Sequence, residues 1–117
     1  MEHDPVDPVS EAGAARGFES PALIWWILIP VGMGLTTALA LIPAAYAILP
    51  SALAGLLSPA VVRSIFVVAV ALHLLEGVYA GFRARRRELP ALRWAAQTTL
   101  LGYPSLRLLL RLTEPEA

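Results

Sequence analysis

A mostly apolar run enclosed by two arginines is the feature that most constrains this chain. Between Arg63 and Arg83 stand residues 64–82, SIFVVAVALHLLEGVYAGF, in which only His73 and Glu76 can carry charge near neutral pH. An α-helix rises about 1.5 Å per residue, so this run covers nearly the whole hydrocarbon core of a bilayer, about 30 Å. The sequence therefore predicts a membrane-spanning helix over residues 64–82.

The composition of the whole chain also indicates a membrane protein. Of its 117 residues, 57% are hydrophobic and 15% are charged, and the mean hydropathy is +0.66. A water-soluble globule of this length would leave too much of that apolar surface exposed. The chain contains no cysteine, which excludes disulfides, thiolate catalysis and cysteine-ligated zinc.

Two further apolar blocks predict two further spans. Residues about 22–42 contain no charged side chain, and Trp25 and Trp26 lie near the start of this block, where an interfacial aromatic belt would place them. Residues about 90–112 form the third block, which is interrupted by Arg93, Pro104, Arg107 and Arg111. It spans only if its arginines snorkel outward or face protein. The predicted fold class is an all-α membrane protein with three transmembrane helices in one domain, residues 21–112.

The remaining segments are predicted to lie outside these spans. Residues 1–20 are acidic and contain prolines without an apolar period, so we expect a disordered tail, and residues 113–117 form a second short tail. The acidic N-terminal segment argues against a secretory signal peptide, the competing interpretation of residues 22–42. Residues 43–60 are apolar but rich in proline. We expect a short interfacial or re-entrant stretch there, in which Ser51 caps a helix.

Basic residues gather after the second apolar block and predict the orientation of the chain. This connector holds one acid, Glu88, against five arginines: Arg83, Arg85, Arg86, Arg87 and Arg93. The positive-inside rule places the connector, and with it the N-terminus, in the cytoplasm. Because the cluster is short and has no interleaved aromatic residue beyond Trp94, nucleic acid is not an expected partner.

A polar cluster is predicted inside the membrane domain. His73 and Glu76 lie deep in the second span, where an unpaired charge costs several kcal/mol. At about 100° per residue the two share one helix face with small residues. A hairpin of the second and third spans would bring further polar residues to the same depth. The predicted cluster comprises His73, Glu76, Tyr79, Gln97 and Thr98.

Three roles for this cluster stay open. Its members could fix the packing of the helices through hydrogen bonds. They could instead bind a lipid headgroup, a sterol hydroxyl or a helix of another subunit. As a third alternative, His73 and Glu76 are the catalytic residues and act as acid and base on an apolar substrate. No metal site is expected, since one His and one Glu supply only two ligands, and no sequence motif predicts a cofactor.

Two motifs in the second half of the chain resemble a family of small multi-pass membrane proteins, the transmembrane protein 254 family. HLLEGVYA at residues 73–80 is followed by the basic connector and then by WAAQTTLLGYPSL at residues 94–106. The resemblance covers roughly residues 60–112, and Pro104 and Arg107 depart from it. It implies a three-helix membrane protein and implies no known activity, substrate or cofactor. The matching positions are His73, Glu76, Tyr79, Ala80, Trp94, Gln97, Thr98, Gly102 and Ser105.

These observations together lead to one expected function and one alternative. We expect a non-enzymatic accessory or lipid-interacting membrane protein, whose partners are membrane lipids and either further copies of itself or a larger membrane protein. The alternative is a small lipid- or sterol-modifying enzyme that uses His73 and Glu76.

Overall fold

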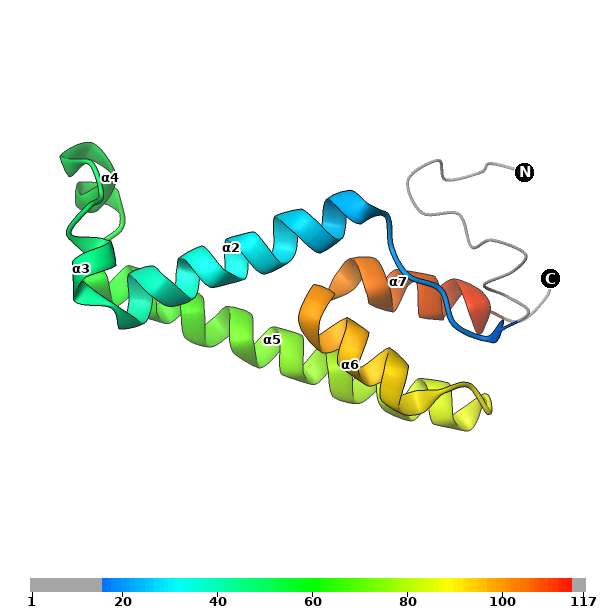
Figure 1. The fold of residues 1–117 in the computed structure, drawn as a ribbon. Helices are drawn as coiled ribbons and strands as arrows, with labels where there is room; N and C mark the ends of the chain where they lie inside the picture. Colours follow the sequence, from blue (N-terminus) through cyan, green and yellow to red (C-terminus); the bar gives the residue numbers. More distant parts are fainter. Residues whose placement is uncertain (1–15, 115–117) are drawn as a thin grey trace.

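The computed structural model describes residues 16–114, and within that range every regular element is a helix. Two long antiparallel helices, α2 and α5, are joined at one end by the short α3 and α4, while α6 and α7 fold back against the C-terminal half of α5 (Figure 1). In chain order the helices are α2 (Leu23–Leu41), α3 (Pro43–Tyr46), α4 (Ser51–Leu56), α5 (Pro59–Arg86), α6 (Ala91–Leu101) and α7 (Tyr103–Leu112).

Helices α2 and α5 are the two that are long and apolar enough to cross a membrane among the described residues. The first predicted span, residues 22–42, is confirmed as a continuous helix that passes through Pro30. The second, residues 64–82, lies inside a longer helix, because Ser58 caps α5 by accepting the backbone N–H of Val61 (3.3 Å) and Pro59 occupies its first turn. The exposed side chains of both helices are mostly apolar.

The connection between these helices consists of α3 and α4. Ser51 does not cap α4, contrary to the prediction: it is the first residue of the helix, and Pro50 stands at the cap position without a side-chain hydrogen bond. The Tyr46 hydroxyl donates to the carbonyl oxygen of Leu57 (2.8 Å), which ties the end of α3 to the end of α4. Residues 43–60 thus form a compact loop of short helices at one end of the α2–α5 pair (Figure 1).

The predicted third span over residues 90–112 is wrong. The segment is broken at Gly102, which has a φ of +67°, into α6 and α7, and neither half reaches the length of a bilayer. Glycine tolerates this backbone conformation, and Pro104 at the start of α7 cannot supply a backbone N–H to continue α6. The segment therefore forms a helix–turn–helix that folds back on itself.

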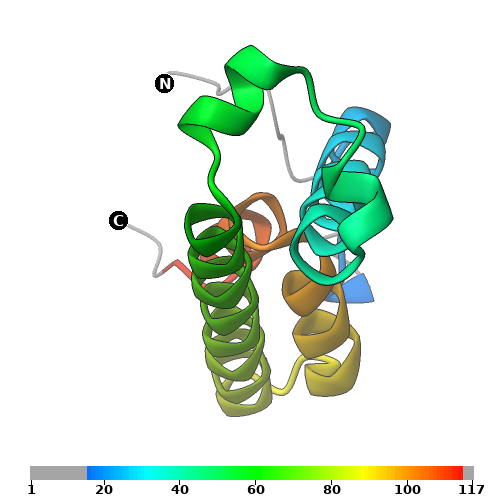
Figure 2. The same ribbon diagram turned by 90° about the vertical axis from the view of Figure 1, so that its left-hand side faces the viewer.

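This helix–turn–helix packs most extensively against α5. Gly77 permits the close approach, since a Cβ there would lie 3.1 Å from the carbonyl oxygen of Ala95 and would collide with the hydroxyl of Thr99. Viewed along the long axis, α2, α5 and α6 occupy three corners of the molecule (Figure 2). Helix α7 then returns toward the C-terminal end of α5, where Thr113 meets Arg83.

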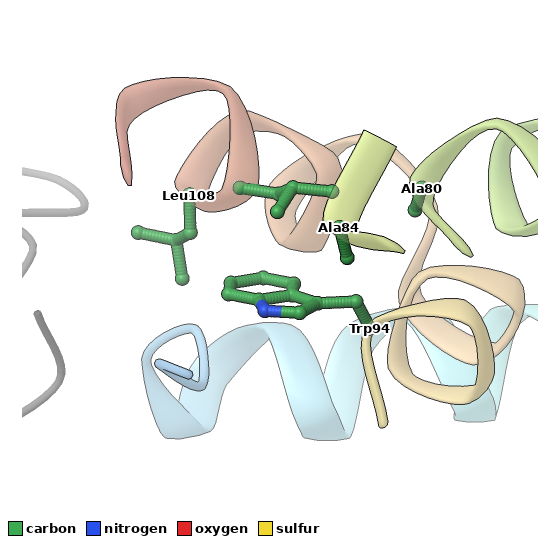
Figure 3. Close-up of a cluster of buried hydrophobic side chains, with 5 residues drawn as sticks. Ala80, Ala84, Trp94 and Leu108 are labelled. Atoms are coloured by element: carbon green, nitrogen blue, oxygen red, sulfur yellow. The ribbon is translucent and has the colours of Figure 1, made fainter. Parts of the chain in front are cut away.

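A small hydrophobic core lies where α5, α6 and α7 meet. The Trp94 indole is fully buried between Ala84 of α5 and Leu108 of α7 (Figure 3). Ala80 and Leu109 complete this cluster. The alanines of α5 leave room for the large indole, so small residues on one helix are matched by a large residue on its neighbour.

The segment that precedes α2 is ordered from residue 16 onward. The Trp94 indole N–H donates to the carbonyl oxygen of Gly17 (2.8 Å), and the rings of Phe18 and Trp94 meet edge to face with centroids 5.0 Å apart. The prediction of a disordered tail over residues 1–20 is therefore wrong for residues 16–20, because Trp94 and the polar residues of α6 hold them. Residues 1–15 and 115–117 lie outside the described range.

Candidate functional site

His73 connects the middle of α5 to the end of α6. Its ring is partly buried, and Nδ1 lies 2.8 Å from the carbonyl oxygen of Thr99. Because a carbonyl oxygen only accepts, Nδ1 carries the hydrogen in this bond. Thr99 belongs to the last turn of α6, whose carbonyl groups lack partners within the helix, so His73 satisfies one of them.

Glu76 lies one turn further along α5 and faces the break between α6 and α7. Its Oε2 atom lies 2.9 Å from the position that a Cβ on Gly102 would occupy, and Nε2 of His73 lies 3.5 Å from the same point. Both side chains therefore contact the one residue at the turn. Among the described residues no hydrogen bond or ion pair is formed by the Glu76 carboxylate, which is partly exposed.

Gln97 and Thr98 belong to a second, buried polar group on the other side of α6. The Gln97 amide nitrogen donates to the carbonyl oxygen of Glu19 (2.9 Å) and to the hydroxyl of Ser105 (3.0 Å), while its amide oxygen accepts from Ser20 (2.6 Å). The hydroxyls of Thr98 and Ser105 are 2.9 Å apart. This group joins the segment before α2 to both α6 and α7.

Tyr79 lies in a third polar group, at the C-terminal end of α5. Arg83 donates from Nε to the hydroxyl of Thr113 (2.6 Å) and from Nη1 to the hydroxyl of Tyr79 (3.3 Å). Thr113 in turn donates to the carbonyl oxygen of Leu109 (2.8 Å). The guanidinium of Arg83 thereby ties the end of α7 to α5.

The comparison with known families agrees with this arrangement. A family model described as Transmembrane protein 254 matches residues 24–111, from the first turn of α2 to the last turn of α7. The chain belongs to the transmembrane protein 254 family. The resemblance seen in the sequence is thus confirmed, and so is the membrane protein class. No curated protein and no solved structure matches the chain.

In this member of the transmembrane protein 254 family, the five polar residues predicted as one cluster are distributed over three groups. His73 and Glu76 meet at Gly102, Gln97 and Thr98 meet at Ser105, and Tyr79 meets Arg83. In the described part of the chain no side-chain hydrogen bond links one of these groups to another, although the backbone N–H of Gly102 donates to the carbonyl oxygen of Thr98 (2.6 Å). The separation follows from the fold, because Gln97 and Thr98 are directed toward α7 and the segment before α2.

Sequence reasoning missed several partners of these residues. No sequence pattern marked Thr99 or Thr113 as a hydrogen-bond partner, since threonines near helix ends are common. Ser20 was assigned to a disordered tail. Gly102 and Ser105 were part of the family motif and were not included in the predicted cluster, although a glycine beside a proline marks a helix break.

The basic residues of the connector have different surroundings. The side chains of Arg85, Arg86 and Arg87 are exposed, whereas Arg93 stands over the Phe18 ring, with 6.0 Å between the guanidinium carbon and the ring centroid. Helix α5 continues through Arg86, so most of the predicted connector is helical. Residues 16–114 contain no group of three or more His, Cys, Asp or Glu side chains that could hold a metal ion.

Proposed function

We propose that this protein is a lipid-interacting accessory membrane protein, in which Glu76 offers a hydrogen-bonding position to a polar lipid group at the break between α6 and α7. The observation that carries the proposal is the Glu76 carboxylate itself, which is partly exposed and unpartnered within residues 16–114. A carboxyl group within a hydrocarbon layer is costly unless it is protonated or paired.

The position of Glu76 supports a ligand that reaches below the membrane surface. Arg83 is seven positions further along the helix, which corresponds to about 10 Å along α5. A broken helix inside a membrane is tolerated where protein or a polar ligand satisfies its backbone, and such breaks often form binding sites. His73 already donates a hydrogen bond to the carbonyl oxygen of Thr99. The Glu76 carboxylate is therefore the group that can accept a hydrogen bond from a lipid hydroxyl.

An accessory role is supported by the shape of the described chain. Apart from the helix–turn–helix of α6 and α7 and the loop of α3 and α4, the described residues form two long apolar helices and no separate domain outside the membrane. The proposed protein partner is a second copy of the chain or a larger membrane protein. Arg107 does not require an acidic residue of that partner, because it already has an interaction within the chain.

Lipid retention by paired variants tests the role of Glu76. The tagged protein is purified in mild detergent, and the copurified lipids and proteins are quantified by mass spectrometry. We expect Glu76→Leu to lose a hydroxyl-bearing lipid that the wild type retains, and Glu76→Gln to keep it, because an amide can still accept and donate. Equal lipid content in the wild type and Glu76→Leu, with both folded, would overturn the proposal.

A second candidate function, a lipid- or sterol-modifying enzyme, is favoured by one observation. Nε2 of His73 and Oε2 of Glu76 approach the same point at Gly102, as an acid and a base acting on one substrate would. Glu76→Gln separates the two candidates, since an amide preserves hydrogen bonding but cannot transfer the proton. In an assay of lipid turnover, an enzyme would lose activity in this variant while remaining folded.

A further inference from the structure

The geometry points to a binding site for the phosphate group of an anionic phospholipid at the C-terminal end of α5. A pocket of about 450 Å³ is lined there by Tyr79, Phe82, Arg83, Arg86 and Arg87. Three of these five side chains are arginines, and none of the described residues that line the pocket is acidic. The pocket is therefore suited to an anion.

The lining residues lie on one face of α5 because of their spacing. Positions 79, 82, 83, 86 and 87 recur at intervals of three and four residues, which places their side chains side by side on a helix. The neighbouring face, which carries Ala80 and Ala84, is buried against α6 and α7. Arg85 points away from the pocket and lines a mostly apolar groove on the other side of the helix.

One arginine in the pocket is already held in position. Arg83 uses Nε to bind Thr113 and Nη1 to bind Tyr79, so its side chain is ordered before a ligand arrives. Its Nη2 atom, and the side chains of Arg86 and Arg87, have no hydrogen-bond partner among the described residues. Guanidinium groups bind phosphate through paired, charge-assisted hydrogen bonds, and these donors remain available for that purpose.

The depth of the pocket matches the phosphate level of a bilayer. From Arg63 to Arg83 helix α5 rises about 30 Å, which is the thickness of the hydrocarbon core. Residues 83–87 therefore lie at the membrane surface, where anionic headgroups are concentrated. Phe82 gives the pocket an apolar wall on which the first part of an acyl chain can pack. A lipid satisfies both features, whereas a free phosphate ion satisfies only the charge.

This inference does not depend on the role proposed for Glu76. The arginines of the pocket lie about 10 Å or more nearer to the membrane surface along α5 than Glu76 does. Its ligand is defined by a negative charge rather than by a hydroxyl donor. The test below leaves Glu76 unchanged, so failure of either proposal leaves the other intact.

The test compares lipid binding by variants that each remove one positive charge. Purified full-length protein in a neutral detergent is titrated with short-chain phosphatidylglycerol or phosphatidylcholine, and bound lipids are counted by native mass spectrometry. We expect the wild type to bind phosphatidylglycerol at least about fivefold more tightly than phosphatidylcholine. Arg86→Gln and Arg87→Gln should each weaken this binding by about five- to tenfold. Arg85→Gln is the matched control and should change it less than about twofold.

Three outcomes would overturn the inference. The first is equal weakening by Arg85→Gln and Arg86→Gln, which would show diffuse attraction by net charge rather than a pocket. The second is equal affinity for the two lipids. The third is complete displacement of phosphatidylglycerol by millimolar inorganic phosphate, which would show that the site takes a free ion. All three glutamine variants alter exposed side chains, and their thermal unfolding is measured alongside to show that each is folded.

Discussion

The imidazole of His73 binds the carbonyl oxygen of Thr99 at 2.8 Å, so a side chain from the middle of the longest helix completes the end of another helix. In a membrane the backbone groups at a helix break must be satisfied by protein, because hydrocarbon offers no hydrogen bonds. His73 is thus part of the reason that α6 can end against the middle of α5.

Removal of this hydrogen bond should destabilise the fold. His73→Phe keeps an aromatic ring of similar size and removes the donor, which leaves the Thr99 carbonyl without its partner. We expect a loss of about 1–2 kcal/mol in the free energy of unfolding. The measurement is reversible unfolding in mixed micelles. Leu74→Phe, on an exposed position of the same helix, is the control and should be close to neutral.

Glycine substitutions should distinguish the α5–α6 interface from the exposed surface of α2. At Gly77 a methyl group meets Thr99 and lies 3.1 Å from the Ala95 carbonyl oxygen, whereas at Gly32 it meets nothing within 4 Å. We expect Gly77→Ala to lower stability by about 1–3 kcal/mol through overpacking. Gly32→Ala should be neutral or slightly stabilising because alanine favours the helix. Equal effects of the two changes in the same unfolding experiment would contradict this interface.

Glu88→Gly should stabilise the protein. Glu88 has a φ of +57° just after α5, and the N–H of Leu89 donates to the carbonyl oxygen of Ala84 (2.9 Å), which together form a Schellman motif. The left-handed backbone conformation costs a residue with a Cβ about 1 kcal/mol in folding free energy, and it costs glycine almost nothing. We expect the midpoint of thermal unfolding to rise. An unchanged or lower midpoint would show that the Glu88 side chain contributes more than its backbone costs.

Two tryptophan changes should differ in their effect on stability. The Trp94 indole N–H binds Gly17, whereas the buried Trp25 indole N–H has no partner among the described residues. Trp94→Phe should release the segment around Gly17 and increase trypsin cleavage after Arg16, with a loss of about 1 kcal/mol in stability. Trp25→Phe removes an unsatisfied donor and should be neutral or stabilising. Rapid cleavage after Arg16 in both variants would argue against the specific role of Trp94.

The position of the chain ends can be tested directly, because the protein contains no cysteine. The structure places Gly17 against α6 and Thr113 against the end of α5, so a two-crossing arrangement puts both on one side of the membrane. Single cysteines at the exposed Arg16 and Glu114 should react with an impermeant maleimide from the same side, and one at Ser51 from the other. Labelling of Arg16→Cys and Glu114→Cys from opposite sides would restore the three-span topology.

The long helices could be predicted from the sequence, because their signal is local. A mostly apolar run of sufficient length is typical of a spanning helix, and both α2 and α5 have the length and composition to cross a membrane. The segment over residues 90–112 has the same length and misled the prediction. Its glycine and proline marked a break, but whether the chain continued outward or turned back depended on the contacts of α5 with α6.

The sequence by itself determined the membrane class, the two helices that are long and apolar enough to cross a membrane, the family and the identity of the polar residues. Only the tertiary structure decided how those residues are grouped: His73 and Glu76 at Gly102, Gln97 with Ser20 and Ser105, and Tyr79 with Arg83. The physical reason is that helix periodicity specifies which side of its own helix a residue occupies. It does not specify the partner, which depends on where Gly102 reverses the chain and on how closely Gly77 lets α6 approach α5.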